Sequence, residues 1–167
     1  MSDGPAGQRD DGEGEGRADA GLREIGLETF APYLINRISA RYSADMGEAL
    51  RSRGLTTAKM RALAVLAVHP GLTVNELAVY AVMEQSTMSR TLDALADAGL
   101  VERRPREADG RVRECSLTPA GEAAFADVWP LMRRAEARMF AGIDAADRAS
   151  FMATLGHILR NIRQHDF

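Results

Sequence analysis

The segment from Gly71 to Thr118 places the tightest constraint on the fold, because two short helical patterns are followed at once by a short strand pattern. The first helix begins at a capping box, Thr73 with Glu76, and ends near Tyr80. Three residues of turn, 81–83, lead into a second helix over residues 84–98, which Gly99 ends. Two short helices with a tight joint predict a helix-turn-helix.

A β-hairpin is expected directly after this pair of helices. Residues 100–104 and 111–117 read as strands, and residues 105–110 as a polar turn that ends in Asp-Gly. Thr118 and Pro119 then form an N-cap and a first helical residue. A helix-turn-helix followed by a hairpin is the winged arrangement, in which the second helix enters the major groove of DNA.

The flanking segments predict further helices. Residues 30–50 and 57–68 carry apolar side chains at helical spacing, and so do residues 119–141 and 145–165. The fold class is therefore mainly α, as a small α+β protein with a winged helix-turn-helix lobe and a helical region at both ends. We expect an acidic disordered tail over residues 1–20, a helical dimerisation region over 21–56 and 119–167, and a DNA-binding lobe over 57–118.

The net charge of the whole chain does not support nucleic-acid binding, whereas the charge of one of its segments does. The formal net charge is −3, but residues 1–20 hold six acidic and two basic side chains. Residues 101–113 hold five arginines against three acidic residues. A phosphate backbone responds to local charge, so the hairpin is a candidate for DNA contact. A charge run on a solvated loop is the alternative.

The candidate DNA-contacting residues follow from these two elements. In the second helix Met88, Leu92 and Leu95 form the buried stripe, and the opposite face is polar. Gln and Arg suit bidentate bonds to base edges, whereas Ser and Thr donate to phosphates or bases. The expected set is Thr73, Gln85, Ser86, Thr87, Ser89, Arg90, Arg104, Arg106, Asp109, Arg111 and Arg113. Within it, Arg111 is the choice for insertion into a groove, and Asp109 is expected to orient an arginine.

The segments LTVNELA, EQSTMSRTLDALADAGLVERRP and DGRVRECSLTPAGEA together resemble the MarR family of bacterial regulators. The resemblance covers about residues 27–165. It implies a ligand-responsive DNA-binding regulator, commonly a repressor, that forms a homodimer on a pseudopalindromic double-stranded operator. In the usual family pattern Asp and Arg are adjacent at the wing tip, whereas here Gly110 separates Asp109 from Arg111.

The resemblance places the dimer contacts in the terminal helices, and the residues agree, because the end of the chain has more apolar side chains than one small lobe could bury. The expected interface residues are Trp129, Met132, Phe140, Phe151, Leu155, Ile158, Leu159 and Ile162. An intrachain three-helix core is the alternative.

Members of the family typically release DNA when a small aromatic acid binds between the dimer helices and the DNA-binding lobe. An arginine in a partly apolar cavity suits a carboxylate. The candidate residues here are Tyr33, Asn36, Arg37, Met60 and Arg61. Surface arginines paired with acidic neighbours are the alternative. An oxidant-sensing thiol at Cys115 is the rival switch, although a buried structural cysteine is favoured.

Other functional classes lack a supporting pattern. The sequence shows no nucleophile motif, phosphate loop or metal-ligand spacing, so we expect neither an enzyme, a cofactor nor a bound metal. No apolar run approaches a membrane span, and a cytoplasmic protein without membrane contact is expected. A winged helix can also dock proteins, but such a surface needs exposed aromatic or Met anchors, and here Arg, Gln and Ser are found instead.

Overall fold

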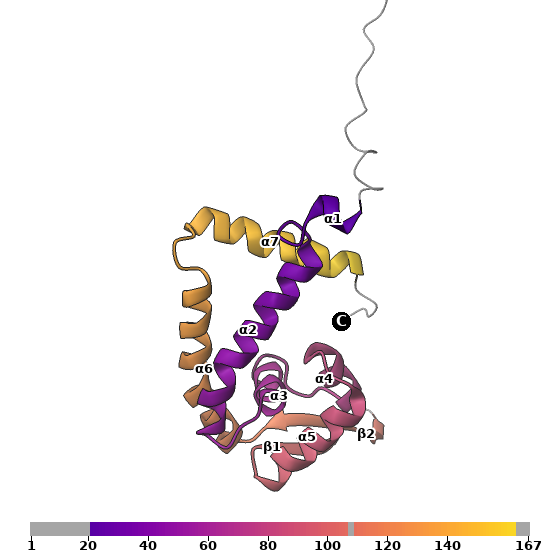
Figure 1. Ribbon diagram of the computed structural model, residues 1–167. Helices are drawn as coiled ribbons and strands as arrows, with labels where there is room; N and C mark the ends of the chain where they lie inside the picture. Colours follow the sequence, from indigo (N-terminus) through magenta and orange to yellow (C-terminus); the bar gives the residue numbers. More distant parts are fainter. Residues whose placement is uncertain (1–20, 107–108, 163–167) are drawn as a thin grey trace, which may run out of the picture. The chain divides into compact units, whose positions relative to one another are not determined.

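The computed structural model describes residues 21–106 and 109–162 of the 167-residue chain (Figure 1). The elements are α1 (Leu22–Ile25), α2 (Ala31–Arg51), α3 (Thr57–Val68), α4 (Val74–Tyr80), α5 (Gln85–Asp97), β1 (Val101–Arg106), β2 (Asp109–Leu117), α6 (Pro119–Met139) and α7 (Ala145–Ile162). The fold is mainly helical with one two-stranded hairpin, as the sequence predicts. The single turn α1 was not expected.

The chain divides into two compact units, one ending at Tyr42 and the other beginning at Ser43. The first unit contains α1 and the first part of α2, and the second contains all later elements. The three-part division expected from the sequence therefore remains a prediction. The acidic tail at 1–20 and the end of the last helix, 163–165, lie outside the described residues.

The core of the second unit is an apolar cluster beneath the helix-turn-helix. The side chains that are almost completely buried are Leu50, Leu63, Leu66, Leu77, Met88, Leu92, Leu95, Cys115 and Val128. They come from the end of α2 and from α3, α4, α5, β2 and α6. The stripe expected on α5, Met88 with Leu92 and Leu95, is confirmed, because each of its members has 0% exposure. This packing buries one face of α5 in the lobe.

Local capping signals set the start of α4. Thr73 Oγ1 accepts a hydrogen bond from the backbone N–H of Glu76, and the Glu76 carboxylate accepts one from the Thr73 N–H at 2.7 Å. Both halves of the capping box are thus formed. In the joint between α4 and α5, Val82 has φ 53° and its side chain is 81% exposed. A β-branched residue in this left-handed region is strained.

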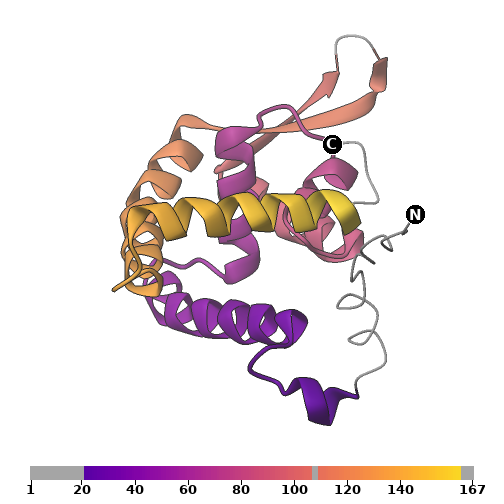
Figure 2. The same ribbon diagram turned by 90° about the horizontal axis from the view of Figure 1, so that it is seen from above.

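The hairpin is longer than the sequence predicts. Pro105 and Arg106 belong to β1, and Asp109 already belongs to β2, so the assignment of 105–110 to a turn was wrong at both ends. Pro105 pairs with Arg113, and the register shifts between Pro105 and Arg106. β1 pairs on one side only, with β2, and a proline on such an edge strand can be placed without the loss of a ladder hydrogen bond. Figure 2 shows the two strands side by side as one ribbon.

A short bridge adds a third segment to the sheet, which the sequence analysis missed. Cys115 N–H donates to Leu72 O at 2.8 Å, and Gly71 N–H donates to Cys115 O at 2.9 Å. The residues before α4 are therefore tied to β2, as an isolated antiparallel bridge between Leu72 and Cys115. This tie joins the helix-turn-helix to the base of the hairpin.

Gly121 lets α6 start against the hairpin. Thr118 caps α6 by accepting from the Gly121 N–H at 3.1 Å, and its hydroxyl donates to Gly99 O at 2.6 Å. A Cβ at Gly121 would lie 2.0 Å from Leu100 O. Only glycine allows this close approach of two backbones.

Candidate nucleic-acid interface

The exposed face of α5 is polar over its N-terminal half. Gln85, Ser86, Thr87 and Arg90 are exposed, and Ser89 is half-buried. Arg90 Nε donates to Ser86 O at 3.2 Å, which holds the arginine stem along the helix. Such a face, opposite a fully buried stripe, can present donors and acceptors to the edges of base pairs.

Thr73 has a different position from the other candidates. It lies one residue before α4, and its hydroxyl is half-buried within the capping box, where it also donates to the Glu76 carboxylate at 2.7 Å. These bonds lower the pKa of Glu76 through the backbone and side-chain hydrogen bonds from Thr73, and the charge of Arg106 lowers it further. The hydroxyl of Thr73 thus already serves the start of α4.

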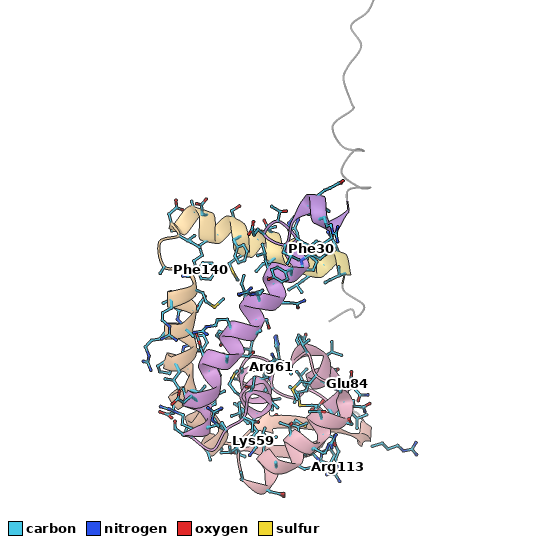
Figure 3. All side chains as sticks on the ribbon, in the orientation of Figure 1. Phe30, Lys59, Arg61, Glu84, Arg113 and Phe140 are labelled. Atoms are coloured by element: carbon cyan, nitrogen blue, oxygen red, sulfur yellow. The ribbon has the colours of Figure 1, made fainter. Side chains whose placement is uncertain are left out.

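The wing arginines differ in what surrounds them. Arg104 is 75% exposed and pairs with Glu102 at 2.9 Å. Arg111 and Arg113 are exposed on β2, and Arg113 has no ion-pair partner among the described residues. Glu84, next to the start of α5, and Arg113 on the wing are labelled in Figure 3. Asp109 starts β2, but its side chain lies outside the described part of the structure.

Arg106 ties the wing to the helices. Its guanidinium forms an ion pair with Glu114 on the neighbouring strand and lies 3.9 Å from the carboxylate of Glu76. Glu76 in turn caps α4. Arg106 therefore connects both strands with the first helix of the helix-turn-helix.

Arg103 is a residue that the sequence analysis counted as charge but did not assign to a site. It is 26% exposed and lies 2.8 Å from the carboxylate of Asp93 on α5. The alternation of side chains along β1 could have indicated that Arg103 faces the lobe, because residues two apart in a strand lie on the same face and Val101 is buried. Its partner Asp93 lies on α5 and is 56% exposed.

Comparison with known proteins agrees with this geometry. The family model described as the MarR family matches residues 53–112. The HTH-type transcriptional repressor Rv2887 of Mycobacterium tuberculosis is 33% identical over 133 residues, which are 78% of this chain and 96% of that protein. The chain belongs to the MarR family of winged helix-turn-helix transcriptional regulators.

Solved structures give the same result. A MarR-family transcriptional regulator from Silicibacter pomeroyi superposes with a TM-score of 0.84 at 48% identity, covering 89% of this chain and 100% of that one. The complex of Rv2887 with salicylic acid superposes with a TM-score of 0.63 at 31% identity, covering 76% of this chain and 94% of that one. This is a family of transcriptional regulators and not of enzymes.

The candidate effector residues of this MarR-family chain lie in both units. Tyr33, Asn36 and Arg37 belong to the first unit, where Arg37 Nη1 donates to the Tyr33 hydroxyl at 3.0 Å. Met60 and Arg61 belong to the second unit, on α3. Met60 is 3% exposed and forms part of the core, whereas Arg61 is half-buried without an ion pair to any described residue. Arg61 is labelled in Figure 3.

The Cys115 thiol is inside the DNA-binding lobe. It has 0% exposure, and burial raises its pKa, an effect that the nearby charge of Arg103 opposes. A buried thiol with a raised pKa is protonated at neutral pH and reacts slowly with oxidants. These properties are those of a structural cysteine.

Several large apolar side chains of α7 are exposed in the described chain. No residue of α7 is buried, and Phe151, Leu159 and Ile162 are 43%, 64% and 67% exposed. Phe140 at the end of α6 contacts Phe151 edge-on, with ring centroids 5.9 Å apart. Of the other expected interface residues, Trp129 is 48% exposed. The half-buried ones are Met132, Leu155 and Ile158.

Two further features concern the described residues alone. Across 21–106 and 109–162 no helix is both long and apolar enough to cross a membrane. Within the same ranges no cluster of His, Cys, Asp and Glu side chains could hold a metal ion.

Proposed function

We propose that this MarR-family regulator is a homodimeric repressor that reads double-stranded DNA with α5 and the wing, and that an aromatic carboxylate releases it. The observation that carries the proposal is the surface of the second unit. Gln85, Ser86 and Arg90 are exposed on α5, and Arg111 and Arg113 are exposed on the wing that follows it. Family membership itself implies DNA binding and a dimer.

The two parts of this surface suit different parts of DNA. The side chains of α5 offer amide, hydroxyl and guanidinium groups at the N-terminal half of the helix, which is the part that enters the major groove. The wing offers guanidinium groups on a narrow ribbon, which suits phosphates or a minor groove. Arg104 and Arg113 belong to this second group, with Arg111 proposed to reach furthest.

A dimer would cover the apolar face of α7. A helix with four large apolar side chains more than two-fifths exposed, here Phe151, Met152, Leu159 and Ile162, is unfavourable in water unless a partner buries them. We propose that Phe151, Leu159 and Ile162 meet a second copy of the chain, together with Trp129 and Phe140. The relative Rv2887 and the IacR protein of Pseudomonas putida, 24% identical, are both named transcriptional repressors, which supports the same role here.

The effector proposal rests on relatives and on Arg61. Rv2887 has been solved with salicylic acid and with p-aminosalicylic acid, at 31% and 30% identity to this chain. Both ligands carry a carboxylate on an aromatic ring. Arg61 is half-buried and makes no ion pair within the described chain, so its guanidinium is available to such a carboxylate. Tyr33, Asn36, Arg37 and Met60 stay candidate contacts on the basis of the sequence alone.

The DNA-binding proposal is tested by fluorescence anisotropy with a labelled duplex from upstream of the protein's own gene, at two salt concentrations. The wild-type chain should bind this duplex more tightly than a scrambled one and lose affinity as salt rises. Arg111→Ala should weaken binding, and Gln85→Ala should change the preferred bases. Arg134, exposed on α6, supplies the control variant Arg134→Ala, which should bind normally. Equal binding by wild-type and Arg111→Ala proteins would refute the role of the wing.

The effector proposal is tested in the same assay with salicylate and p-aminosalicylate. Either acid should release the wild-type protein from the duplex, and Arg61→Met should require a higher concentration of acid while binding DNA normally. Benzyl alcohol, which has the ring without the carboxylate, is the control ligand and should not release it. Release by the alcohol and the acids at equal concentrations would contradict a carboxylate site.

A further inference from the structure

Arg103 and Arg104 are neighbours in β1 with opposite surroundings. The side chain of Arg103 is 26% exposed, whereas that of Arg104 is 75% exposed. Successive side chains of a strand point to opposite faces of the sheet, so Arg103 lies on the inner face with Val101. Its partner in the strand register is Cys115, which is completely buried. Arg103 is therefore enclosed between the wing and the lobe.

The guanidinium of Arg103 holds α5 at two points. Nη1 lies 2.8 Å from Asp93 Oδ1, and Nη2 donates to Ser89 O at 3.4 Å. Ser89 and Asp93 are four residues apart, which places them one above the other on the same side of the helix. A planar group that contacts two successive turns fixes both the position of a helix along its axis and its rotation about that axis.

Stability alone does not account for the position of this arginine. Its Nε is buried and finds no hydrogen-bond partner in the part of the chain that the structure describes. A buried donor without an acceptor is unfavourable, and an ion pair to Asp93, which is 56% exposed, gives little in return. What the arrangement does supply is a defined orientation of α5 relative to β1.

That orientation matters for the polar face of α5. Ser86 and Arg90 lie within one turn of Ser89, on the same side of the helix or next to it. On the opposite side, Met88, Leu92 and Leu95 are buried, and apolar contacts of this kind are not directional. A small rotation or slide of α5 would displace every base-contacting side chain at once relative to the wing.

We propose that Arg103 is a positioning residue, which sets the recognition helix α5 at the angle to the wing that a specific DNA sequence requires. The inference rests on the proposed function, because it assumes that α5 and the wing bind DNA together. On this view Arg103 acts through Asp93 and Ser89 and contacts no phosphate. The arginines of the wing thus divide by role, with Arg103 inside and Arg104 facing DNA.

The test compares Arg103→Met with Arg104→Met in the full-length protein, since both variants remove one positive charge from adjacent positions of β1. Anisotropy is measured on the duplex that the wild-type protein selects from a randomised pool and on a random-sequence duplex of the same length. Arg103→Met should reduce the preference for the selected duplex about tenfold, comparable to a mismatched base pair, and leave the salt dependence unchanged. Arg104→Met should weaken both complexes and lower the salt slope by about one.

Asp93→Asn tests the same contact from the other side, at a side chain outside the core. It should reduce the preference as Arg103→Met does, and the double variant should show no further loss, because the two residues act as one unit. Arg103→Lys, which keeps the ion pair but not the planar fork, should fall between wild type and Arg103→Met. Circular dichroism checks that each variant is folded at the assay temperature.

Three results would overturn the proposal. A salt slope that falls by about one in Arg103→Met would mean that Arg103 contacts a phosphate directly. An unchanged preference in both Arg103→Met and Asp93→Asn would mean that the contact does not orient α5. Additive losses in the double variant would mean that the residues act separately. A wild-type protein that selects no duplex would refute the proposed function itself, whereas the other results leave that function standing.

Discussion

Replacing Gly121 with alanine should strongly destabilise the DNA-binding lobe. The added Cβ would lie 2.0 Å from Leu100 O and 3.0 Å from Leu100 C, whereas ordinary contact begins at 3.4 Å. The distance from the added Cβ to the oxygen is thus 1.4 Å too short. Only a movement of the backbone can lengthen it, because neither Leu100 atom belongs to a flexible side chain. The first turn of α6 would have to move away from the segment that enters β1.

The cost follows from what this movement breaks. Overpacking against a rigid neighbour costs about 1–3 kcal/mol. The shift also disturbs the cap of α6, where the Gly121 N–H donates to Thr118 Oγ1 at 3.1 Å, and loss of a cap costs about 1 kcal/mol. Alanine has a higher helix propensity than glycine by about 1 kcal/mol, and this gain offsets the cost of the lost cap. A net loss of about 3 kcal/mol remains, at the upper end of the overpacking range.

Thermal and urea unfolding, followed by circular dichroism at one fixed protein concentration, measure this loss. In a protein of this size the midpoint should fall by about 10 °C. Gly47→Ala is the matched control, because a Cβ at Gly47 in α2 meets only the end of the Arg51 side chain, at 3.4 Å. That variant should be as stable as wild type or more so. A Gly121→Ala protein that unfolds like Gly47→Ala would refute the argument from close approach.

Three other substitutions test separate parts of the lobe. Val82→Asn should stabilise the protein by about 1 kcal/mol in urea unfolding, because asparagine tolerates the left-handed conformation at φ 53° and an 81% exposed side chain loses no packing; a less stable variant would show that Val82 makes an essential contact. Since the pKa of Glu76 is lowered in the folded state, its contribution to stability is present above the usual glutamate pKa and is lost as the pH falls through the folded value. Glu76→Gln should therefore flatten the acid side of a stability profile measured by thermal unfolding, and an unchanged profile would contradict this assignment. Arg113→Met should lower the salt slope of DNA binding by about one, as expected for an exposed arginine that contacts a phosphate, whereas Lys59→Met on α3 should leave the slope unchanged.

Much of the lobe could be predicted from the sequence because its signals are local. The capping box at Thr73, the Thr118-Pro119 start of α6 and the buried stripe of α5 each depend on residues within one or two turns. The structure confirms all three. The ends of the strands could not be predicted in this way, since β1 continues through Pro105 only because β2 lies beside it.

The sequence by itself determined that this is a winged helix-turn-helix protein with a polar face on α5, because hydrophobic period and caps encode those elements directly. Composition alone could not separate the arginines of the wing, and the alternation of side chains along β1 distinguishes Arg103 from Arg104 without naming their partners. Only the tertiary structure placed Arg103 against Asp93 and Arg106 against Glu114, while leaving Arg113 exposed. Contacts between residues distant in the chain depend on how the elements pack. The division between arginines that hold the lobe together and arginines available to DNA is therefore a property of the fold.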